Sequence, residues 1–259
     1  MDFDYIEQGD CLELMRKIPD GSIDMILCDL PYGTTRNKWD SVIPFEPLWE
    51  QYERIIKDNG AIVLFGQGIF FIDLVNSNRK LFRYDLVYDK QLASGFLNAN
   101  RMPLRRHEQI AVFYKKSPVY VPQFTLGNPL HSKGTSYKNK KLKNENYGDY
   151  HVVDDIRAGS TKKYPVSILS FCKPHPSVAV HPTQKPVELC EYLIRTYTNE
   201  GDIVLDNCMG SGSTCVAAMN TGRHYIGFEL DLHYFAIACQ RLCECYRTLT
   251  GLEKADLIN

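Results

Sequence analysis

The segment Asp29-Leu30-Pro31-Tyr32 places a carboxylate, a proline and an aromatic ring within four residues. Pro31 fixes its own φ angle, the oxygens of Asp29 accept hydrogen bonds, and the Tyr32 ring offers a flat face. Such a loop could hold a planar heterocycle with an amino group, whose two N–H bonds Asp29 and a backbone carbonyl accept while Tyr32 stacks on the ring. By itself, the segment is explained equally well as a plain turn.

A glycine-rich turn between residues 206 and 214 is the second candidate site. It reads Asp206-Asn207-Cys208-Met209-Gly210-Ser211-Gly212-Ser213-Thr214. An apolar run that ends in an acid and turns through Gly-x-Gly into a helix lets a ligand approach the backbone closely. A dinucleotide site would need a small residue where Cys215 stands, and Asp206 would repel a pyrophosphate. Glu229 ends the next apolar run and is placed to accept both hydroxyls of a ribose. The turn favours a nucleoside-like cofactor with an ammonium and a sulfonium; the alternative is a tight turn without a ligand.

Alternating strands and helices must position these two loops. Apolar runs of four to seven residues, each followed by a turn and a longer amphipathic stretch, recur at both ends of the chain. We expect strands over residues 23–28, 61–65, 83–88, 109–114, 203–206 and 225–229, and helices over 47–57, 187–197, 213–220 and 232–246. The first helix should stop at Asn59-Gly60. The pattern predicts an α/β fold with a mostly parallel sheet and helices on both faces.

Residues 116–176 lose this alternation and are rich in Pro, Gly, Asn, Lys and Tyr, which indicates an insertion. Ten basic and four acidic residues lie between positions 115 and 163, a net charge of +6, whereas the whole chain carries -1. A basic segment on an acidic body is expected where one face meets a phosphate backbone. The candidate DNA contacts are Lys133, Lys138, Lys140, Lys141, Lys143, Lys162 and Lys163. A solvated loop is the alternative interpretation.

The bulk composition is that of an ordinary globular protein of 259 residues, 44% of them hydrophobic. The sequence has no apolar stretch of about 18 residues and its first ten residues are acidic, so we expect a cytoplasmic protein without membrane contact. The nine cysteines are scattered and form no C-x-x-C pair. We therefore expect reduced thiols and no metal site.

Several segments in a fixed order resemble the S-adenosylmethionine-dependent DNA amino-methyltransferases. Asp29-Leu30-Pro31-Tyr32 is similar to their D-P-P-Y motif, and residues 206–214 resemble their cofactor loop. Residues 181–186 are similar to the segment before that loop, residues 9–14 to a motif that contacts the cofactor's adenine, and residues 100–113 to a further typical segment. The catalytic loop precedes the insertion and the cofactor loop, which matches the circularly permuted beta class. The resemblance implies a Rossmann-like class I methyltransferase fold.

The resemblance also implies roles for single residues. The catalytic residues would be Asp29, Leu30, Pro31 and Tyr32. The cofactor would contact Asp10, Cys11, Asp29, Lys185, Asp206, Gly210, Ser211, Gly212, Ser213, Thr214, Glu229 and Leu230, with Lys185 near its carboxylate. Residues 1–115 would form the catalytic part, 116–176 the target-recognition insertion, and 177–259 the cofactor-binding part. Leu30 stands where the family has Pro, and the backbone carbonyl required there is retained.

The resemblance implies methyl transfer to N6 of adenine in double-stranded DNA, because Asp29 rather than Ser opens the motif. Cytosine N4 is the alternative target, and a non-catalytic DNA-binding protein with the same fold is an alternative of another class. A nicotinamide-dependent dehydrogenase is disfavoured by Cys215, and a cytosine-C5 enzyme by the lack of a Pro-Cys turn at Cys172. A cognate restriction endonuclease and a homodimer are partners that the resemblance leaves open.

Overall fold

The computed structural model describes residues 3–34, 40–129, 143–144, 148–149, 159–173 and 184–251. The chain divides into two compact units, one made of Met1–Val121 and Ser167–Asn259 and a smaller one of Pro122–Val166. In the described part of the smaller unit, β6 (Thr125–Leu126) pairs with β9 (Lys162–Lys163), and β7 (Lys143–Asn144) with β8 (Gly148–Asp149). This unit is shorter than the insertion expected at 116–176.

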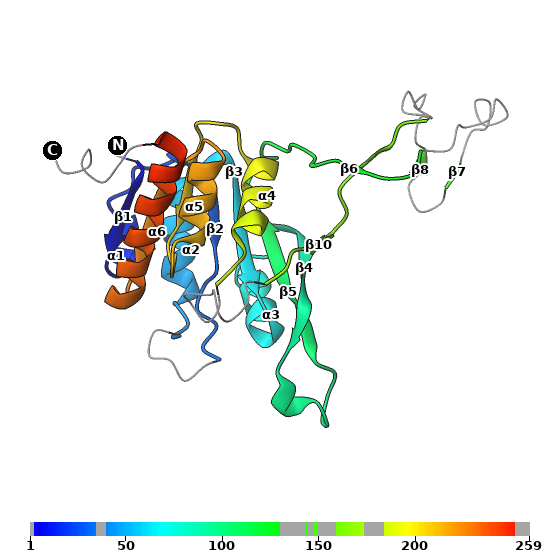
Figure 1. The fold of residues 1–259 in the computed structure, drawn as a ribbon, viewed down its shortest axis with the longest axis horizontal. Helices are drawn as coiled ribbons and strands as arrows, with labels where there is room; N and C mark the ends of the chain where they lie inside the picture. The colour runs from blue at the N-terminus through cyan, green and yellow to red at the C-terminus, as the bar shows by residue number, and fades with distance from the viewer. Residues whose placement is uncertain are drawn as a thin grey trace. The chain divides into compact units, whose positions relative to one another are not determined.

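An eight-stranded sheet forms the centre of the larger unit (Figure 1). In spatial order its strands are β1 (Tyr5–Gln8), β12 (His224–Glu229), β11 (Ile203–Asp206), β2 (Ile23–Cys28), β3 (Ile56–Gly66), β5 (Arg105–Phe113), β4 (Phe82–Ser94) and β10 (Ile168–Ser170). Neighbouring strands are parallel except at β5, which runs antiparallel to both β3 and β4. The predicted mostly parallel sheet is confirmed.

Helices cover both faces of the sheet because the central strand β2 is apolar on both. Ile26 and Cys28 belong to the core beneath helices α1 to α3, whereas Met25 and Leu27 belong to the core beneath α4 and α5. The helices are α1 (Cys11–Met15), α2 (Phe45–Ile55), α3 (Gly68–Ser77), α4 (Val187–Tyr197), α5 (Ser213–Asn220) and α6 (Leu232–Thr250). A strand buried on both faces is typical of α/β folds, which confirms the predicted layering.

Strands β2 and β11 and helices α4 and α5 have the predicted boundaries, but the expected helix end at Asn59-Gly60 is wrong. Helix α2 ends at Ile55, and the chain enters β3 directly at Ile56. The pairing of β3 with β2 shifts register across residues 57–60, which form a bulge. A Cβ on Gly60 would lie 2.8 Å from the carbonyl oxygen of Asp24. Gly60 therefore permits close strand approach and does not stop a helix.

Five elements in the described part of the larger unit were not predicted, namely β1, α1, α3, the short helix η1 (Phe96–Asn98) and β10. Strand β10 lies inside the expected insertion, yet it pairs in parallel with β4 and completes the edge of the main sheet. Short elements of three to five residues, such as β1, α1 and β10, carry too little periodicity to be recognised. Within the described ranges, no helix is long and apolar enough to span a membrane.

Candidate active site

A cavity of 530 Å³ lies at the carboxyl ends of β2, β11 and β12. From β2 the chain passes through α2 to β3 on one side, whereas from β11 it passes through α5 to β12 on the other side. The strand order therefore reverses between β2 and β11, which is where open α/β sheets bind their ligands. Both loops singled out in the sequence, after Asp29 and after Asp206, line this cavity.

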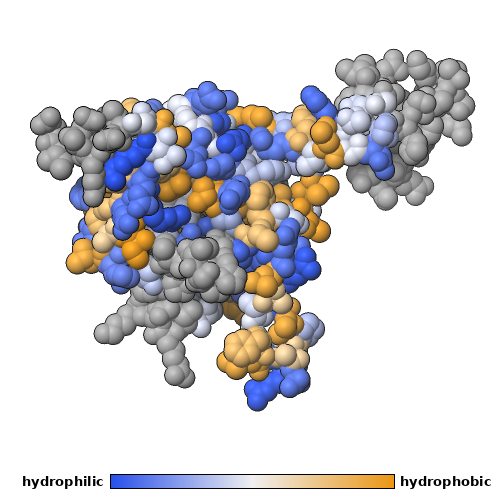
Figure 2. Space-filling model, viewed as in Figure 1, coloured by the Kyte–Doolittle hydropathy of each residue, from blue (hydrophilic) through white to orange (hydrophobic). Residues whose placement is uncertain are grey.

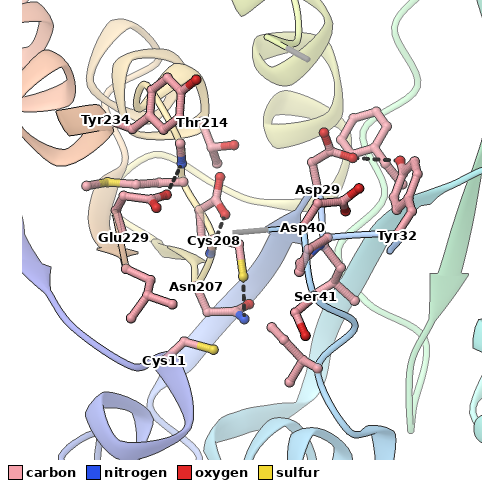
Figure 3. A pocket seen from close by; sticks show the side chains of 18 of the residues that line it. Cys11, Asp29, Tyr32, Asp40, Ser41, Asn207, Cys208, Thr214, Glu229 and Tyr234 are labelled. Carbon is pink, nitrogen blue, oxygen red and sulfur yellow. Dashed lines mark hydrogen bonds between the residues drawn. The ribbon is translucent and has the colours of Figure 1, made fainter. Parts of the chain in front are cut away.

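Asp29 follows β2 directly and is held at both carboxylate oxygens. The Tyr32 hydroxyl donates to Oδ1 over 2.6 Å, and the Lys185 ammonium donates to Oδ2. Burial raises the pKa of Asp29, the positive charge of Lys185 opposes this shift, and the nearby Glu108 carboxylate adds to it. Figure 3 shows Asp29 and Tyr32 on one side of the cavity and Glu229 on the other, with Asn207 and Cys208 between them. The acid is thus a fixed acceptor at one end of the cavity.

Lys185 belongs to a chain of alternating charges. Its Nζ lies 3.1 Å from Oε2 of Glu108, whose Oε1 lies 3.3 Å from Nζ of Lys90. Lys185 and Lys90 are only 8% and 5% exposed. Burial alone would lower the pKa of Lys185, but the carboxylates of Asp29 and Glu108 outweigh burial and raise it above its ordinary value. Lys185 therefore stays charged, and its charge is shared between two acids.

The loop after Asp29 is anchored at three points. The Leu30 side chain is 3% exposed and packs in the core beneath α1 to α3. The Tyr32 ring stacks on Phe70, with centroids 4.7 Å apart and an interplanar angle of 27°. The Asp40 carboxylate accepts from the backbone N–H groups of Gly33 and Thr34 over 2.8 and 2.9 Å. Burial of Leu30 supplies the rigidity that a proline would otherwise give this position.

The glycine-rich turn and Glu229 are joined by backbone hydrogen bonds. Gly210 and Asp231 donate their N–H groups to Oε2 and Oε1 of Glu229, each over 2.8 Å. Gly212 adopts a φ of 79° as the N-cap of α5, and a Cβ there would lie 3.2 Å from the Cβ of Ala238. A glycine is required for both reasons. Each Glu229 oxygen retains capacity for a further hydrogen bond.

Asp206 ends β11 at the floor of the cavity, where it is 4% exposed. Its Oδ1 accepts from the Cys208 N–H over 3.1 Å. Burial raises the pKa of Asp206 to about 6, although hydrogen bonds from the Thr214 hydroxyl and the Cys208 N–H oppose the shift. A buried carboxylate with a raised pKa is stabilised by a cationic ligand, so the floor of the cavity favours positive charge.

Asp10, the N-cap of α1, and Cys11, the first residue of that helix, line the cavity just after β1. The Asp10 carboxylate caps α1 by accepting from the Leu12 N–H over 2.8 Å. Gly9 donates its N–H to the carbonyl of Glu229 over 2.9 Å, which holds this loop against the end of β12. The first and last strands of the chain, adjacent in the sheet, therefore deliver Asp10 and Glu229 to the same end of the cavity.

The structure gathers nearly all of the predicted catalytic and cofactor residues around this cavity. The lining includes Asp10, Cys11, Asp29, Leu30, Pro31, Tyr32, Lys185, Asp206, Gly210, Ser211, Ser213, Thr214, Glu229 and Leu230. Gly212 shapes the turn without lining the cavity. Of the predicted DNA contacts, Lys133, Lys138, Lys140 and Lys141 lie outside the described residues, Lys143 falls in β7, and Lys162 and Lys163 form β9. The functional roles of these residues stay predictions.

Glu108 and Asn207 also line the cavity; both lie in segments singled out in the sequence, but neither side chain was given a role. Glu108 bridges Lys185 and Lys90 as described above. Asn207 is 1% exposed, and its Oδ1 accepts from the Tyr52 hydroxyl over 2.5 Å. The sequence offered one signal for both residues: each is a polar side chain within or beside an apolar strand. A polar side chain buried at such a position needs a hydrogen-bond or ion-pair partner. Within the described ranges, no group of three His, Cys, Asp or Glu side chains could hold a metal ion.

Comparison with known proteins gives a family match over most of the chain. Residues 23–240 match the family model N6_N4_Mtase, described as DNA methylase. The Type II methyltransferase M2.MboI of Moraxella bovis is 26% identical, with 92% of this chain and 87% of that protein covered. The Type II methyltransferase M.BglII of Bacillus subtilis is 29% identical, with 92% of this chain and 68% of that protein covered.

Solved structures share the fold. The M1.HpyAVI–SAM complex superposes with a TM-score of 0.59 at 24% identity, with 91% of this chain and 98% of that chain covered. The PvuII DNA methyltransferase, described as cytosine-N4-specific, gives a TM-score of 0.63 at 16% identity, with 97% and 94% covered. At these identities the likeness establishes the Rossmann-like fold, and the predicted fold class is confirmed.

Proposed function

The chain belongs to the DNA methylase family, and from this membership we propose that it transfers a methyl group from S-adenosylmethionine to N6 of an adenine flipped out of duplex DNA. The observation that carries the proposal is the placement of Asp29, an amino-group acceptor, in one cavity with the glycine-rich turn and Glu229. In this proposal the chain is a circularly permuted beta-class enzyme. Its target-recognition insertion is the smaller unit Pro122–Val166, which lies within the predicted range 116–176.

The cavity residues fit this cofactor. The volume of 530 Å³ falls within the range of small-molecule sites, about 300–1,000 Å³. Glu229 would accept the ribose hydroxyls, Asp206 would face the ammonium, and Asp10 with Cys11 would border the adenine. An ammonium has three donors. Lys185 donates one hydrogen bond to Asp29 and forms an ion pair with Glu108 at 3.1 Å, so a further donor can meet the cofactor's carboxylate. Once bound, the cofactor supplies an electrophilic methyl group.

Asp29 and the Leu30 carbonyl would accept the two N–H bonds of the target amino group and expose its lone pair. Phe70 covers one face of Tyr32, so the base would stack on the opposite face. The new N–CH3 bond forms as the S–CH3 bond breaks, and the nitrogen then loses one proton. Because burial raises the pKa of Asp29, its carboxylate is a suitable acceptor for that proton. Transfer is direct, with no covalent enzyme intermediate.

The test is transfer of a labelled methyl group to varied duplex DNA, followed by digestion to nucleosides and mass spectrometry. We expect N6-methyladenine. N4-methylcytosine would overturn the adenine assignment but leave the family function intact. No transfer to any DNA would favour the non-catalytic DNA-binding alternative. Sequencing modified bases in a host that expresses the protein identifies the base and its sequence motif together.

Asp29→Ala should abolish methyl transfer, with a loss of about 10³-fold or more, because it removes an acceptor aimed at the reacting nitrogen. Binding of S-adenosylmethionine, measured by calorimetry, should change by only a few-fold. Asp73→Ala removes an exposed acid from α3 and is the matched control, for which we expect unchanged activity. An Asp29→Ala enzyme with normal activity would refute the proposed role of this residue.

A further inference from the structure

The β4–β5 hairpin extends beyond the end of the sheet that carries the active site (Figure 1). Strand β5 pairs with β3 only as far as Gly66 and Gln109, whereas β4 and β5 continue to pair as far as Ser94 and Arg105. Beyond Gln109, β5 continues for four residues to Arg105, about 13 Å at 3.3 Å per residue, while β4 is irregular between Asp89 and Ser94. Past Asp89, the last β4 residue that pairs with β10, the hairpin is a two-stranded ribbon that projects from the catalytic edge of the sheet.

The tip of this ribbon combines exposed apolar side chains with positive charge. Phe96 and Leu97, in the short helix η1 (Phe96–Asn98), are 77% and 81% exposed. Residues 91–105 contain no acidic side chain and include Arg101 and Arg105, both exposed. Figure 2 shows hydrophobic and hydrophilic residues side by side on the β4–β5 hairpin, at the bottom of the view. A cluster of this kind marks a binding surface.

Specific hydrogen bonds hold the tip in place. Arg106 binds Asp89 through two parallel contacts of 2.7 and 2.9 Å, and the Ser94 hydroxyl donates to the carbonyl of Arg105 over 3.0 Å. Gly95 adopts a φ of 82°, and its carbonyl accepts from the Asn98 N–H over 2.9 Å. The apolar side chains are thus presented on an ordered scaffold, which reduces the entropy lost when they bind.

The base of the same ribbon is part of the catalytic cavity. Glu108, on β5, contacts Lys185, which in turn contacts Asp29. Gln67 lines the cavity and donates through Nε2 to the carbonyl of His107 over 3.0 Å. The hairpin is therefore tied to the cavity through Glu108 and His107 of β5, so a molecule bound at the tip has a fixed position relative to the cavity.

We propose that the hairpin tip enters a groove of the DNA beside the target base, where Phe96 and Leu97 pack into the space that the flipped base leaves. This inference rests on the proposed function. A major groove about 12 Å wide admits a two-stranded ribbon, and apolar wedges commonly stabilise unstacked base steps. The charge of Arg101 suits phosphates. A second copy of this chain fits less well, because it would bring like-charged arginines together.

The test compares two duplexes that carry the motif identified by sequencing, one fully paired and one with a mismatch opposite the target base. A mismatch lowers the free-energy cost of extruding the target base. It therefore substitutes for part of the stabilisation that the wedge, Phe96 and Leu97, provides. For Phe96→Ser/Leu97→Ser we expect kcat/KM on the paired duplex to fall about 10-fold or more, and on the mismatched duplex about twofold or less. Leu249→Ser changes an exposed apolar residue at the end of α6 and should leave both values unchanged.

Arg101→Gln provides a second readout. A phosphate contact acts on both duplexes alike, so binding of both should weaken equally and become less salt-dependent. The wedge is refuted if the double variant keeps wild-type activity on the paired duplex, or if both duplexes lose activity to the same extent. It is also refuted if the double variant converts a dimer into a monomer. A wild-type protein that methylates neither duplex refutes the proposed function instead.

Discussion

Replacement of Asp206 by Asn should stabilise the fold while it weakens cofactor binding. Burial raises the pKa of Asp206 from 3.8 to about 6. At 1.36 kcal/mol per pKa unit, ionisation of the buried acid costs about 3 kcal/mol at pH 7. Asn retains an oxygen for the Cys208 N–H, and its NH2 group can donate to the Thr214 hydroxyl, so up to about 3 kcal/mol of unfolding free energy is gained. A domain of this size gains roughly 2–4 °C in Tm per kcal/mol.

The sign of the pH dependence follows from the direction of the shift. A carboxyl whose folded pKa is raised favours the folded state below its unfolded pKa of 3.8, and this contribution is lost as the pH rises through about 6. The gain in unfolding free energy from Asp206→Asn, and the rise in Tm with it, should therefore be largest above pH 6; the free-energy gain falls to about 0.5 kcal/mol at pH 4. Differential scanning fluorimetry between pH 4 and pH 8 measures it.

Cofactor binding supplies the second half of this prediction. The ionised Asp206 carboxylate attracts a cationic ligand, so wild-type affinity for S-adenosylmethionine should rise as the pH increases through about 6. Asp206→Asn should lower the affinity about 10-fold and remove this pH dependence. Asp202→Asn makes the same change just before the other end of β11, outside the cavity, and serves as the control. A variant with unchanged or lower Tm at pH 7 and wild-type affinity would refute the reasoning.

Two further substitutions test the site. Glu108→Gln leaves two buried lysines without their shared acid, so we expect unfolding free energy to fall by about 3–5 kcal/mol and kcat to fall with it; an unchanged Tm would contradict the charge chain. Gly212→Ala forces φ 79° on alanine and places its Cβ 3.2 Å from Ala238, whereas Gly201→Ala, at φ 81°, meets nothing within 4 Å. Both should lose about 1–2 kcal/mol of stability. Gly212→Ala should lose more stability, because of the contact with Ala238. Equal losses for the two variants in denaturant titration would contradict this, since they would show that the contact with Ala238 costs nothing.

The central elements were predictable because their patterns extend over whole strands and helices. β2 is an apolar run interrupted only by Asp24, β11 is an apolar run that ends in Asp206, and α5 follows a Gly-x-Gly turn, so their boundaries were found from the sequence. The bulge at residues 57–60 was not, because Asn59-Gly60 has the same composition in a helix stop and in a strand irregularity. Only the register against β2 separates the two, and register is a property of the folded sheet.

Glu108 lies in the family-like segment 100–113, but its role in the site was not predicted because of the direction of its strand. Parallel strands deliver functional residues just past their carboxyl ends, which is how Asp29, Asp206 and Glu229 are found from the sequence. Strand β5 is antiparallel to β3, so its amino-terminal half lies at the catalytic edge, with Gln109 opposite Gly66. An acid near the start of an inverted strand therefore occupies the same edge as an acid that follows a parallel one. Since strand direction is set by pairing across more than forty residues, the sequence near Glu108 could not reveal that this acid would meet Lys185.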